Sequence, residues 1–121
     1  MKPIINVALG LFLALSPCLV PVAVAEMTIN VPTDAKTKYT ALNITKRDDG
    51  LVEVTTKREG ISGTTYSKRL VDCANSQFMY LGSGDTLEKM NSGGQADSKM
   101  ASLTEGSAST YVSAYACQNA R

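Results

Sequence analysis

The central part of the chain contains the stretch Leu42-Asn43-Ile44-Thr45-Lys46-Arg47-Asp48-Asp49-Gly50-Leu51-Val52-Glu53-Val54-Thr55-Thr56. Apolar and polar residues alternate on both sides of the Asp49-Gly50 step, which is the two-residue period of a strand with one buried face. An Asp-Gly pair between two such runs favours a tight turn. The stretch therefore predicts a β-hairpin.

The flanking sequence predicts further strands. A second turn is expected at residues 58–63, followed by a strand over residues 64–73 and another over residues 77–81. Before the hairpin, the short alternation of Met27, Ile29 and Val31 predicts an edge strand or a loose lead-in. Short strands at near-regular spacing are typical of an antiparallel meander.

The C-terminal part predicts a long loop and a helix. Residues 82–99 are rich in Gly and Ser, with Leu87 and Met90 as apolar anchors, so we expect a surface loop. Ser107 can cap a helix from Ala108 to about Gln118. Its face toward the sheet is predicted to carry Ala108, Tyr111, Val112, Tyr115 and Cys117. The predicted fold is α+β, an antiparallel meander of four to five strands with one C-terminal helix.

The N-terminus has the pattern of a secretory signal peptide. Lys2 gives it a positive start, and the apolar run of residues 4–15 suits a signal-peptide core but is too short to span a bilayer. Small residues at Ala23 and Ala25 stand at the positions that signal peptidase reads. We therefore expect residues 1–25 to be removed, leaving one exported domain of residues 26–121.

Two other readings of the leader remain open. Residues 15–18 resemble a lipoprotein box in which Cys18 would be lipidated, but Pro17 directly before that cysteine and the apolar residues after it fit poorly. An uncleaved membrane anchor is the remaining alternative. The sequence favours cleavage after Ala25.

Composition argues against several classes of function. The chain has 12 Lys and Arg against 11 Asp and Glu, and Lys2 lies in the leader, so the exported part is neutral, which gives no general attraction to nucleic acid or anionic membranes. There is no His, so catalytic sites built on Ser-His or Cys-His pairs cannot form. The acidic pair Asp48-Asp49 lacks the spacing of a calcium loop. We expect no catalysis, no metal and no cofactor.

Cys73 and Cys117 form an even pair in a chain expected to leave the cytoplasm, where disulfides persist. Closing a loop of that length stabilises a domain by about 4 kcal/mol on the chain-entropy model. Redox and metal-binding roles are the alternatives, but the pair lacks Cys-x-x-Cys spacing and Cys73 follows the acidic Asp72. The sequence favours one structural disulfide.

Three basic pairs, Lys46-Arg47, Lys57-Arg58 and Lys68-Arg69, recur at equal spacing. One interpretation is a cationic face for sulfated glycans or nucleic acid. The turns are instead expected to place Lys46 and Lys68 toward one end of the sheet and Lys57 toward the other, which favours a solvated strand face of mixed charge. Candidate binding residues are Lys57, Arg58, Ser62, Tyr66, Lys68 and Arg69.

The tyrosines offer two interpretations. They could build a binding surface, because Tyr contributes area and a hydrogen bond at little cost in entropy. They could instead complete the core of a chain with few large apolar residues, which is the interpretation we favour. They are Tyr39, Tyr66, Tyr80, Tyr111 and Tyr115.

One stretch of the chain resembles a known family. Leu70-Val71-Asp72-Cys73, the strand Phe78-Met79-Tyr80-Leu81, a Gly/Ser loop, and Leu103-Thr104-Glu105-Gly106-Ser107 before a helix ending at Cys117 resemble the bacterial surface-adhesin protein E-like family. The resemblance implies a small exported domain in which an antiparallel sheet and a C-terminal helix are tied by one disulfide. It also implies a surface or periplasmic binding protein, with adhesion to host matrix in the founding type.

A second resemblance points to another class. Ser62-Gly63-Thr64-Thr65-Tyr66 looks like the Ser-Gly-x-x-Tyr stretch of periplasmic lysozyme inhibitors, β-rich domains whose loop plugs the enzyme's cleft. The same residues also suit an ordinary turn that leads into a strand.

The sequence therefore predicts an exported binding protein of the periplasm or cell surface, with lysozyme inhibition or an envelope interaction role as alternatives. Its partner would be an extracellular or envelope protein, contacted through residues 58–63 and 82–99. We expect no binding to nucleic acid and no stable membrane insertion after cleavage. The sequence leaves open whether the protein forms a homodimer.

Overall fold

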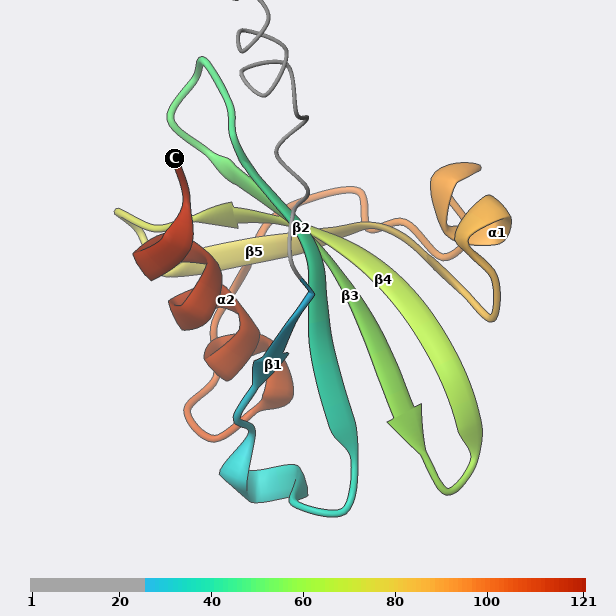
Figure 1. The fold of residues 1–121 in the computed structure, drawn as a ribbon. Coiled ribbons are helices and arrows are strands. Elements are labelled where there is room, and N and C mark those ends of the chain that lie inside the picture. Colours follow the sequence, from blue (N-terminus) through green and yellow to red (C-terminus); the bar gives the residue numbers. More distant parts are fainter. Residues whose placement is uncertain (1–25) are drawn as a thin grey trace, which may run out of the picture.

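The computed structural model describes residues 26–121, so the predicted leader and Cys18 lie outside the described residues. An antiparallel sheet in the order β1-β2-β3-β4-β5-β6 forms the body of the domain, and each strand pairs with its neighbour in the chain (Figure 1). The strands are β1 Met27–Ile29, β2 Lys38–Lys46, β3 Val52–Gly60, β4 Gly63–Asp72, β5 Gln77–Gly84 and β6 Ala101–Ser102. The helices are the 3-10 turn η3 Pro32–Asp34, α1 Leu87–Asn91 and α2 Ala108–Asn119.

The predicted β2–β3 hairpin is present, with its turn at the Asp49-Gly50 step. The amide of Arg47 donates to the carbonyl of Leu51 at 2.8 Å, and Gly50 adopts a φ of 87° that suits glycine. Asp49 accepts a hydrogen bond from the amide of Leu51 at 3.0 Å. The turn residues therefore act as the sequence predicts.

The β3–β4 hairpin turns more tightly than expected. Strand β3 continues to Gly60 and β4 begins at Gly63, so the turn consists of Ile61 and Ser62 instead of residues 58–63. Gly63 has a φ of 116°, which a residue with a Cβ rarely adopts. The residues expected to form a loop thus extend the two strands.

The segment of residues 82–99 is not wholly a loop. Strand β5 runs on to Gly84, and Thr86 caps α1 by accepting a hydrogen bond from the amide of Lys89 at 3.1 Å. Helix α1 lies so close to β5 that a Cβ on Gly82 would overlap the carbonyl oxygen of Met90. Gly82 and Gly84 allow α1 to pack closely on β5, although a Gly-rich segment is typical of a loop.

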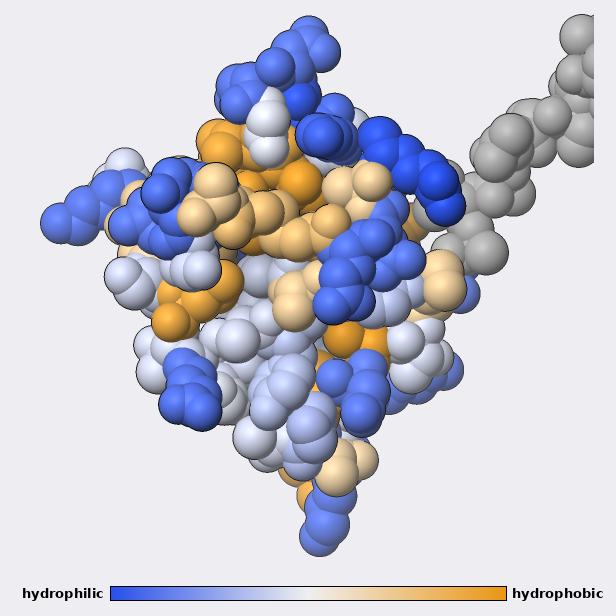
Figure 2. Space-filling model, turned by 90° about the vertical axis from the view of Figure 1, so that its left-hand side faces the viewer, coloured by the Kyte–Doolittle hydropathy of each residue, from blue (hydrophilic) through white to orange (hydrophobic). Residues whose placement is uncertain are grey.

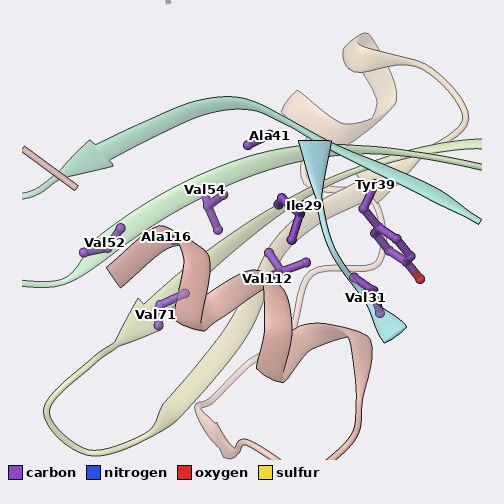
Figure 3. Packing of buried hydrophobic residues seen from close by; sticks show 9 residues of the cluster. All are labelled: Ile29, Val31, Tyr39, Ala41, Val52, Val54, Val71, Val112 and Ala116. Atoms are coloured by element: carbon purple, nitrogen blue, oxygen red, sulfur yellow. The ribbon is translucent and has the colours of Figure 1, made fainter. Parts of the chain in front are cut away.

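Helix α2 packs on one face of the sheet, called the inner face here. Ser107 caps it, as predicted, by accepting a hydrogen bond from the amide of Thr110 at 3.2 Å. Val112 and Ala116 of α2 meet strand residues such as Val54 and Val71, and all four are fully buried (Figure 3). The other cluster members are Ile29, Val31, Tyr39, Ala41 and Val52. Tyr39 confirms that tyrosine completes this small core.

A disulfide joins Cys73, just after β4, to Cys117 in the last turn of α2. The two Cα atoms are 6.0 Å apart. The predicted α+β meander with a C-terminal helix tied back by one disulfide is confirmed, with a sixth short strand beyond the four to five expected. The missed strand β6 has two residues and pairs with Gln77 and Phe78, so it leaves no periodic pattern to read.

Candidate functional site

The candidate binding residues all lie on the β3–β4 hairpin, but the alternation of the strands divides them between two faces. Arg58 and Arg69 belong to the inner face, in the same alternating set as Val54 and Val71. The opposite, outer face carries Lys57, Tyr66 and Lys68, and Ser62 lies in the exposed turn. The two basic pairs of this hairpin, Lys57-Arg58 and Lys68-Arg69, therefore each contribute one cation to each face.

The predicted direction of Lys57 toward the β3–β4 turn, and of Lys68 toward the opposite end, agrees with the register, but the two lysines lie close together. In the register of the hairpin Lys57 lies opposite Tyr66, and Lys68 lies opposite Thr55. Lys57 and Lys68 are therefore diagonal neighbours on one face. Lys57 lies three residues before Gly60 and Lys68 lies five residues after Gly63, so they are only two positions apart along the hairpin.

Arg69 contradicts the expectation of a solvated strand face, because only 4% of it is exposed. Its Nε donates to Oγ of Ser109 at 3.1 Å and its Nη1 donates to Oγ1 of Thr56 at 2.9 Å. Its Nη2 donates to the hydroxyl of Tyr80 at 3.1 Å, and its Cζ lies 4.9 Å from the centre of that ring. Three neutral hydroxyls and an aromatic face thus hold this guanidinium in one position.

The buried charge of Arg69 has no acidic partner. None of the ion pairs within residues 26–121 includes it. Arginine keeps its charge in proteins, and buried charges are normally paired with an opposite charge because desolvation is costly. An unneutralised guanidinium inside a small domain is therefore a feature that needs an explanation.

A groove of about 340 Å³, called the inner groove, opens beside Arg69. Small hydroxyl residues line much of it, namely Thr56, Thr65, Ser67 and Ser83, together with Tyr39, Arg58, Arg69, Tyr80, Gln95 and Ala108. Such side chains are too short to fill the space above the sheet. Helix α2 leaves the β3–β4 end of the inner face uncovered (Figure 1). The groove therefore arises where the helix stops and the side chains become small.

Arg58 stands at the other end of the groove in a hydrogen-bonded cluster with Asp34 and Tyr39. The Asp34 carboxylate accepts hydrogen bonds from Thr37 and Tyr39, both at 2.8 Å, and lies 3.8 Å from Nη2 of Arg58. Hydrogen bonds from Thr37 and Tyr39, with the charge of Arg58, lower the pKa of Asp34. Burial raises the pKa of Tyr39, which keeps its hydroxyl protonated. Unlike Arg69, Arg58 has a counter-charge.

The outer face of the hairpin carries the half-buried Lys57, Tyr66 and Lys68, has α1 packed on the neighbouring strand β5, and ends in an exposed apolar tip. Ile61 is fully exposed, at 106% of its reference area, and Ser62 beside it is exposed as well. Lys57 forms an ion pair of 3.8 Å with Glu59, whose side chain is 42% exposed. The tip, Tyr66 and the two lysines together make a surface of mixed apolar and basic character.

Another hollow, of about 280 Å³, lies beside the end of α2 and is lined by Met27, Ala41, Ile44 and Tyr115 among others. Figure 2 looks at the molecule from the side on which α2 lies, and shows hydrophobic atoms in separate patches among pale and blue ones. This hollow contains no buried charged group that would specify a ligand. It therefore indicates less about a possible ligand than the inner groove does.

Comparison of the chain with models of known protein families, with curated proteins and with solved structures found no match. No helix between residues 26 and 121 combines the length and the apolar character of a membrane span. Within the same residues, no three His, Cys, Asp or Glu side chains gather as a metal site.

Sequence reasoning missed the residues that position the two arginines. Thr56 and Ser109 are ordinary polar residues of a strand and a helix, and Asp34 lies in a segment predicted only as a lead-in. Tyr80 was considered only as a core or surface aromatic. One sequence signal could have identified Arg69 as buried. It lies two residues before the apolar Val71 in β4, so the two share a face of the sheet.

Proposed function

We propose that this chain is an exported binding protein that contacts a protein partner through the outer face of the β3–β4 hairpin and does no catalysis. The observation that carries the proposal is the fully exposed Ile61 at the hairpin tip, next to a face that presents Lys57, Tyr66 and Lys68. Export is supported by the signal-peptide pattern of the first 25 residues and by the disulfide, which suits an oxidising compartment.

The physical case concerns rigidity. The hairpin has a two-residue turn, and its strands stay paired up to Gly60 and Gly63, so its side chains are held in place before binding. A preordered surface loses little conformational entropy on association. Tyr66 adds area and a hydrogen-bonding group with few rotatable bonds. The hairpin can therefore gain affinity from few contacts.

The partner class follows from the compartment and the charges. Protein outside the cytoplasm meets matrix glycoproteins and components of the cell envelope, and adhesion is what the resemblance to the surface-adhesin protein E-like family implies. Two lysines on the outer face favour an acidic patch on the partner, whereas the neutral charge of the exported part gives no general affinity for nucleic acid. Matrix or envelope protein binding is the function we propose.

Lysozyme inhibition is the second candidate, and the position of Ser62 favours it. The Ser62-Gly63-Thr64-Thr65-Tyr66 stretch begins at the exposed tip of the hairpin, where it could enter the cleft of an enzyme. An inhibitor would use the tip, whereas an adhesin-like protein would use the broader outer face. Variants at the two places distinguish them.

The test is biosensor binding of the protein, exported from a bacterial host that expresses the full chain, to immobilised matrix glycoproteins and lysozymes in parallel. Ile61→Ser and Tyr66→Ser should each weaken the binding by about tenfold, as interface anchors do. Met27→Ser is the matched control, because Met27 is also an exposed large apolar residue but lies on β1, an edge strand separated from β3 by β2.

Salt sharpens the result. If the lysines take part, raising the ionic strength should weaken matrix binding in the native protein more than in Lys57→Gln/Lys68→Gln. Saturable binding to lysozyme with none to matrix proteins would favour the inhibitor function. Binding that is unchanged in both the Ile61 and Tyr66 variants would refute the hairpin as the contact surface.

A further inference from the structure

We propose that the inner groove is a binding site for a carboxylate, which neutralises the buried guanidinium of Arg69. This site is independent of the proposed protein contact, because it lies on the opposite face of the sheet. Its central observation is a charged side chain, 96% buried by its exposure of 4%, that lines an open groove and has no acidic partner among residues 26–121.

The hydrogen-bond pattern of Arg69 leaves room for a ligand. A guanidinium has five N–H groups, one on Nε and two on each Nη. The hydroxyls of Ser109, Thr56 and Tyr80 accept one bond each from Nε, Nη1 and Nη2. One N–H on each Nη is left without an acceptor among the described residues. A carboxylate can accept two N–H bonds from one guanidinium.

The surroundings of Arg69 hold it ready. Tyr80 contacts it through both its hydroxyl and its ring, and that hydroxyl also lies 3.2 Å from Oγ of Ser109. Because the hydroxyls are neutral, they fix the position of the guanidinium without cancelling its charge. This is the arrangement expected of a preorganised anion site and not of a structural ion pair.

The charge of the groove fits one negative charge. Arg58 also lines the groove but is offset by Asp34 at 3.8 Å, so Arg69 is the cation whose charge is left over. A carboxylate neutralises it, whereas a doubly charged phosphate would itself be left partly unneutralised. Helix α2 begins at Ala108, which lines the groove, and the positive end of its dipole adds a favourable field.

The carboxylate could come from a small free acid or from the C-terminus of a peptide, and both would offer Arg69 the same group. The groove volume of about 340 Å³ lies at the lower end of the range typical of small-molecule pockets. The hydroxyls of Thr65, Ser67 and Ser83 would then face the rest of the ligand. The chemistry of the head group is what the structure specifies.

The test is a ¹H–¹⁵N NMR titration of the exported protein with matched acid and amide probes: benzoate against benzamide, and N-acetyl-trialanine with a free against an amidated C-terminus. Inorganic phosphate is titrated in parallel. At least one of the two acids should saturably shift the Nε–H signal of Arg69 and the backbone N–H signals of Thr56, Arg69, Tyr80 and Ser109. The amide probes should cause no such shifts. Which acid binds more tightly identifies the source of the carboxylate.

Variants locate the binding. Arg69→Lys keeps the charge but loses the paired donors, and should weaken carboxylate binding by about tenfold or more. Lys46→Gln removes an exposed cation that does not line the groove, so the affinity for the carboxylate should change by about twofold at most. The comparison of acid with amide needs no variant, so it stands even where an Arg69 variant does not fold.

Three results would overturn the proposal. They are the absence of saturable shifts with any carboxylate, binding of phosphate in preference to both acids, and an unchanged affinity for the carboxylate in Arg69→Lys. Loss of partner binding in the hairpin variants bears only on the proposed function, because Ile61 and Tyr66 do not line the groove.

Discussion

Nη1 of Arg69 donates a hydrogen bond of 2.9 Å to Oγ1 of Thr56 on the neighbouring strand. Thr56 does not lie opposite Arg69 in the register, because Arg69 faces Val54 and Thr56 faces Ser67. The arginine side chain therefore runs diagonally across the hairpin toward the groove. This contact links the core, where Val54 is fully buried, to the polar end of the inner face.

The hydrogen bond from Arg69 to Thr56 predicts that removing the Thr56 hydroxyl destabilises the fold. Thr56→Val keeps the shape of the side chain but leaves an N–H of Arg69 without its partner, so the free energy of unfolding should fall by about 1 to 3 kcal/mol. Urea denaturation followed by circular dichroism measures the change. Thr55→Val on the outer face is the matched control and should shift stability by about 0.5 kcal/mol at most. Equal effects of the two substitutions would contradict the role of Thr56.

The Cys73–Cys117 disulfide predicts a larger loss. Replacing both cysteines by Ser should lower the free energy of unfolding by about 4 kcal/mol, because the unfolded chain regains the entropy of an open loop of 44 residues. Intact-mass measurement of the protein isolated without reductant from an oxidising compartment, before and after reduction, should show a gain of two hydrogens. Two free thiols in that protein would refute the bridge.

Close packing of α1 on β5 predicts that Gly82 cannot accept a side chain. Gly82→Ala should reduce stability by about 1 to 3 kcal/mol, because the new Cβ overlaps the backbone carbonyl of Met90, which cannot move without displacing the helix. Gly60→Ala is the control, since its Cβ would meet the Thr37 side chain at 3.1 Å, a contact that a shift of a few tenths of an ångström relieves. Thermal melts that rank Gly60→Ala as the more damaging substitution would count against this packing.

The Asp34 cluster predicts a loss of stability in acid. The pKa of Asp34 is lowered from 3.8 by hydrogen bonds from Thr37 and Tyr39, so the folded state favours the charged carboxylate. This contribution is fully present well above pH 3.8 and is lost as the pH falls through the lower pKa of the folded state.

The variant Asp34→Asn isolates this effect. The melting temperature of the native protein should fall more between pH 6 and about pH 3 than that of the variant, which has no carboxylate to protonate at this position. Parallel melting curves of the two proteins across that range would show that Asp34 makes no such contribution.

Local sequence predicted most of the secondary structure. The Asp49-Gly50 turn, the alternation in β3 and the Ser107 cap act through neighbouring residues, so they can be read without the fold. Helix α1 and strand β6 could not be read in this way. Their stability comes from packing and pairing against β5, and their own composition resembles a loop.

Two register shifts in the sheet explain why the faces were harder to predict than the strands themselves. The register between β2 and β3 shifts between Ala41 and Asn43, so Ala41 and Ile44 both pack on the core although simple alternation would separate them. Between β4 and β5 the register shifts next to Arg69, which lies opposite Tyr80. A bulge changes which residues share a face, and no single-strand pattern reveals it.

The amino-acid order alone predicted the long strands, helix α2, the Asp49-Gly50 turn and the pairing of Cys73 with Cys117, because these follow from local backbone preferences and from the even count of cysteines after the predicted leader. The packed structure alone set which residue of Lys57-Arg58 and which residue of Lys68-Arg69 faces inward. In β4 polar residues occupy both faces, so hydropathy could not assign them. The burial of Arg69, its three hydroxyl partners and the groove beside it arise from residues far apart in the chain, and such contacts exist only once the sheet and α2 have packed together.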